Sequence, residues 1–283
     1  MNAERSPAPV HLPADDHVHS EFSYDTGPSA SMVTSCERAV ALGIPSIAFT
    51  EHLEFTAAVE GDAIGATHLA PSYGARRSEL DIDAYLAAIE ECRGRFPELR
   101  VLSGLESGQP HLFGASEAAV LAGGRFDRVL GSAHAVIHDG ALVEISSLFA
   151  LMPAEDVVRR YFAEVLAVVG CSSPFQVLAH VDFVGRYLPR ACGPYDDKPY
   201  EPEYREVFAA LAASGRALEL NTKSWLTSVG QLRWWYEAGG EAVTFGSDAH
   251  EPWVVGAGFV EAAAMAEAAG FRPGRHPGDW WRR

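Results

Sequence analysis

Short apolar runs alternate along this chain with longer stretches in which apolar residues recur at the spacing of an amphipathic helix. Such continuous runs are typical of strands in a parallel sheet that is covered on both faces. Strands are predicted at residues 10–19, 46–52, 100–106, 127–136, 176–183, 216–223 and 242–250. Helices are predicted at 29–43, 81–97, 116–124, 153–170, 201–215, 228–240 and 255–270. Seven strand–helix units predict an α/β fold in one domain over residues 1–283, a distorted (β/α)7 TIM-like barrel with its core at about 10–270.

A histidine or a carboxylate lies at the C-terminal end of almost every predicted strand. The motifs are HVH with His17 and His19, TEH ending in His52, GLE ending in Glu106, GSAH ending in His134, LAH ending in His180, and SDAH with Asp248 and His250. Because the C-terminal ends of barrel strands share one face, these side chains are expected to meet in one pocket. Imidazoles and carboxylates without thiolates predict a site for divalent metal ions.

Most of these residues also have a structural explanation when each is taken alone. Buried histidines are often only hydrogen-bonded, and Asp25 fits a turn in SYDTG. Glu106 is harder to explain, because a carboxylate after VLSGL is buried at a large cost unless it is paired or bound to a metal. Six of the 11 histidines fall at predicted strand ends, which favours a common cause and keeps Asp25, six residues after His19, as a candidate ligand.

In order and spacing, these motifs resemble those of the PHP (polymerase and histidinol phosphatase) superfamily from about Asp15 to His250. LAHVDFVGRY and LELNTKSW are similar to its histidinol-phosphate phosphatases, although Lys223 and Trp225 stand where small residues are more common, and Glu51 stands where Asp is common. The resemblance implies a seven-stranded barrel with a trinuclear metal cluster. It assigns metal-ligand roles to His17, His19, Asp25, His52, Glu106, His134, His180, Asp248 and His250.

The implied activity is hydrolysis of L-histidinol phosphate to L-histidinol and phosphate, a step of histidine biosynthesis. Glu106, Asp248 and His250 are expected to act most directly in catalysis, with Glu106 able to bridge two ions. The cofactors are expected to be roughly two to three divalent ions, Zn, Mn or Fe, since nine ligands exceed what one ion can use. Two alternatives remain: a PHP-type phosphoesterase acting on nucleotides or short oligonucleotides, and a non-catalytic, metal-stabilised PHP module.

Charged side chains near the catalytic face are candidates for binding the substrate. For the phosphate group, Arg186 is the first candidate, Lys223 the second and Arg160 the third. Glu21, Glu54 and Glu144 are candidates for a cationic amine such as that of histidinol. The long loops at 53–80 and 184–202 are expected to form walls that select the substrate.

Composition narrows the partners and the surroundings of the protein. A formal net charge of −16 argues against a nucleic-acid partner and favours a small phosphomonoester. No apolar stretch approaches membrane-spanning length, and the four cysteines lack metal-binding spacing, so we expect free thiols and a cytoplasmic location without membrane contact. The oligomeric state is left open. The C-terminal HPGDWWRR is expected to be irregular, with Trp280 and Trp281 packed against the barrel wall.

Overall fold

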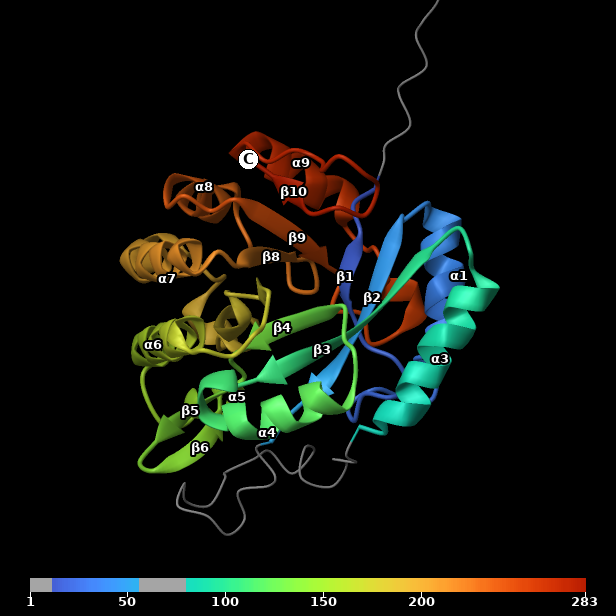
Figure 1. Cartoon of the computed structure of the whole chain (residues 1–283). Helices are drawn as coiled ribbons and strands as arrows, with labels where there is room; N and C mark the ends of the chain where they lie inside the picture. Colours follow the sequence, from blue (N-terminus) through green and yellow to red (C-terminus); the bar gives the residue numbers. More distant parts are fainter. Residues whose placement is uncertain (1–11, 56–79) are drawn as a thin grey trace, which may run out of the picture.

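The computed structural model describes residues 12–55 and 80–283, and its strands curl around a common axis with helices on the outside (Figure 1). Within these residues, seven parallel strands form one sheet in the order β1-β2-β3-β4-β7-β8-β9. They are β1 (Asp15–Val18), β2 (Ser46–Leu53), β3 (Arg100–Gly108), β4 (Arg128–Ser132), β7 (Val177–Leu178), β8 (Ala217–Asn221) and β9 (Ala242–Gly246). The sheet closes where the His19 amide donates to the Ala249 carbonyl at 2.9 Å and the Asp248 amide to the His17 carbonyl at 2.8 Å. The predicted (β/α)7 TIM-like barrel is confirmed.

The helices that cover the barrel begin and end at residues suited to these positions. They are α1 (Met32–Leu42), α3 (Ile82–Arg95), α4 (Pro110–Gly123), α6 (Ala154–Gly170), α7 (Glu201–Ser214), α8 (Val229–Glu237) and α9 (Phe259–Ala269). The side chains of Ser31, Asp81 and Ser228 each accept a hydrogen bond from a backbone amide in the first turn of α1, α3 and α8. Gly43 ends α1 in the left-handed region with a φ of 72°, where a side chain would be strained.

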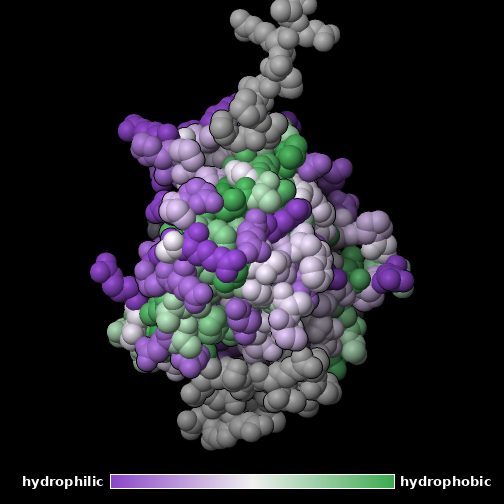
Figure 2. Space-filling model, turned by 90° about the vertical axis from the view of Figure 1, so that its right-hand side faces the viewer, coloured by the Kyte–Doolittle hydropathy of each residue, from purple (hydrophilic) through white to green (hydrophobic). Residues whose placement is uncertain are grey.

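Large apolar side chains from the helices fill the space against the sheet. Tyr161 and Phe162 of α6 and Tyr204 and Phe208 of α7 are buried, and the rings of Phe162 and Tyr204 lie 4.5 Å apart. Each fully buried side chain of this size contributes roughly 1.5–3 kcal/mol relative to exposure. The face that carries α1 and α3 is largely hydrophilic, with apolar residues in small groups (Figure 2). None of the described helices is both long and apolar enough to cross a membrane.

The segments between strands depart from the sequence-based expectations in three places. The helix expected at 116–124 begins at Pro110, and β7 has two residues where a strand over 176–183 was expected. The chain leaves β7 early because the Phe183 amide donates to the His180 carbonyl at 2.8 Å and begins the 3-10 helix η1 (Phe183–Tyr187). A hairpin of β5 (Ala135–His138) and β6 (Ala141–Glu144), followed by the short helix α5 (Ile145–Leu148), was not predicted.

The two loops expected as substrate-selecting walls have different outcomes. Most of the segment at 53–80 lies outside the described residues. The segment at 184–202 contains most of η1 and the 3-10 helices η2 (Arg190–Cys192) and η3 (Lys198–Tyr200).

The C-terminal segment forms a short strand rather than the irregular tail that was expected. β10 (Trp281–Arg282) pairs with β9 in the antiparallel sense, with Trp281 opposite Val243. Trp281 is buried, with its ring 5.0 Å from that of Phe245, so this side chain packs on the barrel wall as predicted. The contact between Trp281 and Phe245 therefore holds β10 against β9.

Candidate metal centre

The nine predicted ligands all lie at the C-terminal ends of the strands, although their positions span most of the chain. His17 and His19 come from the end of β1, His52 from β2 and Glu106 from β3, while Asp25 lies between β1 and α1. His134 follows β4, His180 follows β7, and Asp248 and His250 follow β9. Their donor atoms form four overlapping groups of three with spacings that can hold a metal ion. These groups are His19, His52 and His250; His17, His19 and Asp248; His17, Glu106 and His180; and His52, Glu106 and His134.

Glu106 lies at the centre of the cluster. Its Oε1 atom is 2.7 Å from His180 Nε2 and 3.1 Å from His134 Nε2. Its Oε2 atom is 3.0 Å from His52 Nδ1 and 3.3 Å from His17 Nε2. Since each oxygen faces a different pair of imidazoles, the carboxylate is placed to contribute to two neighbouring sites at once.

Asp248 and Asp25 supply negative charge on the other side of the histidines. Asp248 Oδ1 is 3.6 Å from both His19 Nε2 and His250 Nδ1. Asp25 Oδ2 is 2.8 Å from His250 Nε2 and 3.3 Å from His52 Nε2. Asp25 is absent from the four groups of three, so the structure brings it to the cluster through its contact with these two imidazoles.

The donor set fits divalent metal ions. Asp25 Oδ1 and His180 Nδ1 are buried and have no hydrogen-bond partner among the described residues. Buried polar atoms are rarely left in this state without an ion or a water. Imidazole nitrogens and carboxylate oxygens are ligands for zinc, manganese and iron. The cluster is therefore a site that can hold more than one divalent ion.

Electrostatics in the cluster favour added positive charge. Burial opposes ionisation of Glu106, but His134, His17 and His52 lower the pKa of this carboxyl well below its ordinary value. Burial likewise opposes the charged form of His134, yet Glu106 and Glu54 raise the pKa of His134 to about 9. A bound metal ion replaces the proton on an imidazole nitrogen and supplies positive charge beside the carboxylates in its place.

Carboxylates behind the histidines hold the imidazole rings in place. Sequence-based reasoning did not assign this role to Glu219 or Glu54. Glu219 of β8 accepts from His17 Nδ1 at 2.7 Å with Oε1 and from the His180 amide at 2.7 Å with Oε2. Glu54 Oε1 lies 2.6 Å from His134 Nδ1. A partner on the second ring nitrogen fixes the orientation and tautomer of a metal-binding histidine. The signal for Glu219 was present in the sequence, since ALELN places a carboxylate inside a buried strand.

Glu51 also supports the site, through the loop after β1. Its carboxylate is buried and accepts hydrogen bonds from the Ser20 amide at 3.1 Å, the Ser20 hydroxyl at 2.5 Å and the Ser23 hydroxyl at 2.6 Å. Ser23 in turn lies 3.0 Å from His19 Nδ1. Glu51 therefore holds the loop whose Ser23 contacts His19.

A cavity of about 150 Å³ opens onto the cluster, and two of the three basic candidates line it. Arg186 Nη1 is 2.8 Å from Asp248 Oδ2, and Lys223 Nζ is 2.9 Å from Asp248 Oδ1. Together these two cations hold the pKa of Asp248 well below its ordinary value against the effect of burial. Arg160 does not line the cavity, because it lies on α6 and contacts His138 Nδ1 of the β5–β6 hairpin at 3.0 Å.

None of the three glutamates considered for binding an amine lines the cavity at the metal centre. Glu54 contacts His134, as described above, and Glu21 accepts from the Met32 amide at 2.6 Å at the start of α1. Glu144 is largely buried at the end of β6 and does not line the cavity. Aromatic and neutral groups line the opening instead: Tyr24, Phe183, Tyr187 and Ser224.

Comparison with known proteins agrees with this geometry. The family model for the PHP domain matches residues 15–223, which is well over half of the chain. This chain belongs to the PHP domain family. The match ends before Asp248 and His250, yet the barrel places Asp248 beside His17 and His19, and His250 beside His19.

Among PHP relatives, a protein from Clostridium acetobutylicum named "Probable histidinol-phosphatase" is 26% identical over 265 residues, covering 92% of this chain and 94% of the relative. The histidinol-phosphatase of Lactococcus lactis is 26% identical over 254 residues, covering 83% of each protein. A crystal structure of histidinol phosphate phosphatase from Lactococcus lactis with zinc, L-histidinol and phosphate superimposes with a TM-score of 0.76 at 23% identity, covering 92% of this chain and 95% of that one. At this identity the structural likeness establishes the shared fold.

Proposed function

We propose that this protein is a metal-dependent phosphomonoesterase that hydrolyses L-histidinol phosphate to L-histidinol and phosphate. The observation that carries the proposal is the convergence of the nine candidate imidazole and carboxylate ligands, Glu106 among them, at one end of a PHP barrel. Support for the substrate comes from relatives named histidinol-phosphatase that match along almost their full length.

The proposed cofactors are roughly two to three divalent ions, because the groups of three overlap and nine ligands exceed the needs of one ion. Zinc, manganese and iron all suit these ligands, and the zinc in the Lactococcus lactis structure favours zinc. When bound, such ions supply a deprotonated water near neutral pH and positive charge for the phosphate oxygens. No protein nucleophile is required for this chemistry, so no phosphoenzyme is expected.

Residues of the chain are proposed to bind the metal ions, to orient the histidines and to bind the phosphate group. Glu106 would hold divalent ions with both of its oxygens, and Asp248 and His250, which line the same cavity, are proposed as the other residues that act most directly in catalysis. Glu219 and Glu54 hold His17 and His134 in the orientation needed for binding. Arg186 and Lys223 are proposed to bind the phosphate group, since both line the cavity with their charged ends at Asp248.

The acidic balance of the chain supports a small substrate. With a net charge of −16, the protein repels an approaching polyanion, whereas a small zwitterionic monoester meets little repulsion. The cavity at the metal centre is also small, about 150 Å³. Nucleotides and oligonucleotides are therefore proposed to be poor substrates.

Phosphate release from a panel of substrates tests the proposal. The metal-loaded protein is offered histidinol phosphate, other small phosphomonoesters, dinucleotides and single-stranded oligonucleotides at matched metal and salt. The expected result is the highest kcat/KM for histidinol phosphate. Faster hydrolysis of oligonucleotides would place the activity among PHP nucleases, and no turnover of any substrate with metals bound would contradict the proposed enzyme.

A further inference from the structure

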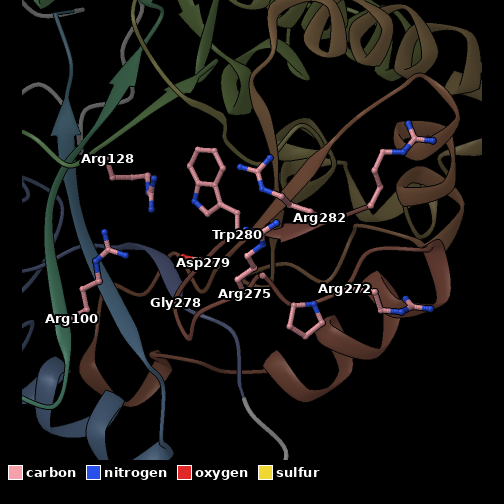
Figure 3. A pocket seen from close by; sticks show the side chains of 11 residues that line it. Arg100, Arg128, Arg272, Arg275, Gly278, Asp279, Trp280 and Arg282 are labelled. Atoms are coloured by element: carbon pink, nitrogen blue, oxygen red, sulfur yellow. The ribbon is translucent and has the colours of Figure 1, made fainter.

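A cavity of about 670 Å³ lies at the opposite end of the barrel, at the N-terminal ends of the strands (Figure 3). Arg100 and Arg128 begin β3 and β4, and they face the C-terminal segment of the chain that carries Trp280 and β10. Arginine is the dominant residue of the lining. The arginines are Arg100, Arg128, Arg272, Arg275, Arg282 and Arg283. Six arginines thus contribute to the lining of one cavity in a protein whose net charge is −16.

The lining of the cavity has far fewer acidic side chains than arginines. Asp279 is the one acidic side chain among the lining residues that the structure describes, and its Oδ2 atom accepts from the His276 amide at 3.0 Å. Arg100, Arg275 and Arg282 form no ion pair with any residue in the described ranges 12–55 and 80–283. The cavity therefore holds three unpaired guanidinium groups from separate positions of the chain.

The other three arginines have local partners that fix their positions. Arg128 Nη2 donates to Asp16 Oδ1 at 2.8 Å, and its guanidinium lies 4.7 Å from the centre of the Trp280 ring. Arg272 donates to the carbonyls of Glu267 and Phe271, each at 2.7 Å. Arg283 stacks over the ring of Tyr236 at 4.2 Å. These contacts make part of the lining rigid before any ligand arrives.

The backbone that carries the arginines is also fixed. The Arg272 amide donates to the Arg282 carbonyl at 2.7 Å, and the Arg282 amide donates to the Arg272 carbonyl at 2.8 Å. Trp280 also lines the cavity, and the Arg128 guanidinium lies over its ring. Fixed donors lose less entropy on binding than mobile ones.

We propose that this cavity is a second binding site, for a small polyanion that carries two or more phosphate groups. Guanidinium groups match phosphate oxygens in a two-pronged geometry and are the preferred donors for this group. A single phosphate would leave part of the positive charge unneutralised, because the unpaired arginines come from β3, β10 and the segment before β10. The volume of about 670 Å³ is within the range of small-molecule sites. This inference does not depend on the proposed hydrolytic activity.

Calorimetric titration with inorganic trimetaphosphate tests this site. Trimetaphosphate is a compact trianion that competes for metal ions less than linear polyphosphates do. Metal-loaded wild-type protein is compared with the double variant Arg100→Ala/Arg282→Ala at fixed salt. Neither side chain has an ion-pair partner among the described residues, so thermal melting is expected to show an intact fold in the variant. Binding to the cavity is expected to weaken at least about ten-fold, since each lost guanidinium removes a charge-assisted hydrogen bond.

The matched control is Arg38→Ala/Arg233→Ala, which removes the same charge from exposed positions on α1 and α8. This control is expected to bind trimetaphosphate like the wild type. Binding of trimetaphosphate at the metal centre is common to all three proteins, so the difference between them isolates the cavity. Equal binding by Arg100→Ala/Arg282→Ala and the wild type overturns the proposal. An equal loss in both double variants also overturns it, because the attraction would then depend on net charge alone.

Discussion

At the C-terminal ends of the strands, Glu106 and Asp248 are buried among imidazoles, whereas at the N-terminal ends Arg100 lies exposed beside Arg128 and the C-terminal arginines. Strand β3 carries Arg100 at one end and Glu106 near the other. The two ends differ in how strongly the structure determines their ligands. Buried carboxylates require compensating charge, so the metal centre is defined from within the protein. Exposed guanidinium groups are solvated without a partner, so the ligand of the arginine cavity has to be found by titration.

Among changes at either end of the barrel, Glu106→Gln is expected to have the largest effect on turnover. It keeps the shape of the side chain and removes its charge. Turnover is expected to fall by at least about 10²–10³-fold, the effect of removing a charge-stabilising group from an active site. Metal content should fall with it, as measured by elemental analysis. Glu117→Gln is the control, because Glu117 is a buried carboxylate on α4 that contacts Ser173 away from the centre. Turnover within a few-fold of wild type in Glu106→Gln would remove Glu106 from the ligands.

Glu219→Gln tests whether the carboxylate behind His17 contributes to metal binding. Glu219 orients His17 and accepts from the His180 amide. The neutral amide of Gln is a weaker acceptor, so metal affinity or activity is expected to fall roughly 10–100-fold. Titration of metal back into chelator-treated protein measures the affinity. An unchanged metal affinity in a folded variant would mean that Glu219 has only a structural role in β8.

Arg186→Ala is expected to act mainly on substrate binding. Loss of a charge-assisted hydrogen bond to phosphate should raise KM for histidinol phosphate by roughly 10–100-fold. Arg190→Ala in the same loop is the control, since Arg190 is exposed and does not line the cavity. A fall in kcat with unchanged KM would show instead that Arg186 works through its contact with Asp248.

The smallest effect on activity is expected at the other end of the barrel. Arg100→Ala/Arg282→Ala should leave kcat/KM for histidinol phosphate within about two-fold of wild type when no polyanion is added, because distant sites act independently. Steady-state phosphate release measures this. A large loss would mean that the two ends of the barrel are coupled even without a ligand.

The sequence could predict that the candidate ligands meet, because one rule places all of them except Asp25. Each of these residues lies at or just after the end of an apolar run, and parallel strands bring the ends of such runs to one face. Glu219 did not follow this rule, since it lies within β8 rather than after it, and its role depends on the register that brings it to His17. Arg160 was considered because of its position in the chain, but the direction of α6 places it at the β5–β6 hairpin.

Local chemistry explains what was missed elsewhere in the fold. The β5–β6 hairpin turns at Asp139 and Gly140, which have φ values of 50° and 79°, and an Asp-Gly pair between apolar residues is a recognisable hairpin signal. The arginine cavity could not be predicted in this way. Arg100 and Arg128 begin parallel strands, whereas the C-terminal segment with the other arginines is held there by the antiparallel pairing of β10, which depends on tertiary contacts.

The count of metal ions per chain tests the central claim most directly. Protein purified without chelators is analysed for its elements, and phosphate release is measured on the same sample. The account predicts about two to three divalent ions per chain, since nine ligands exceed the needs of one ion, and activity that falls as these ions are removed. One ion or none per chain in a fully active sample would contradict it.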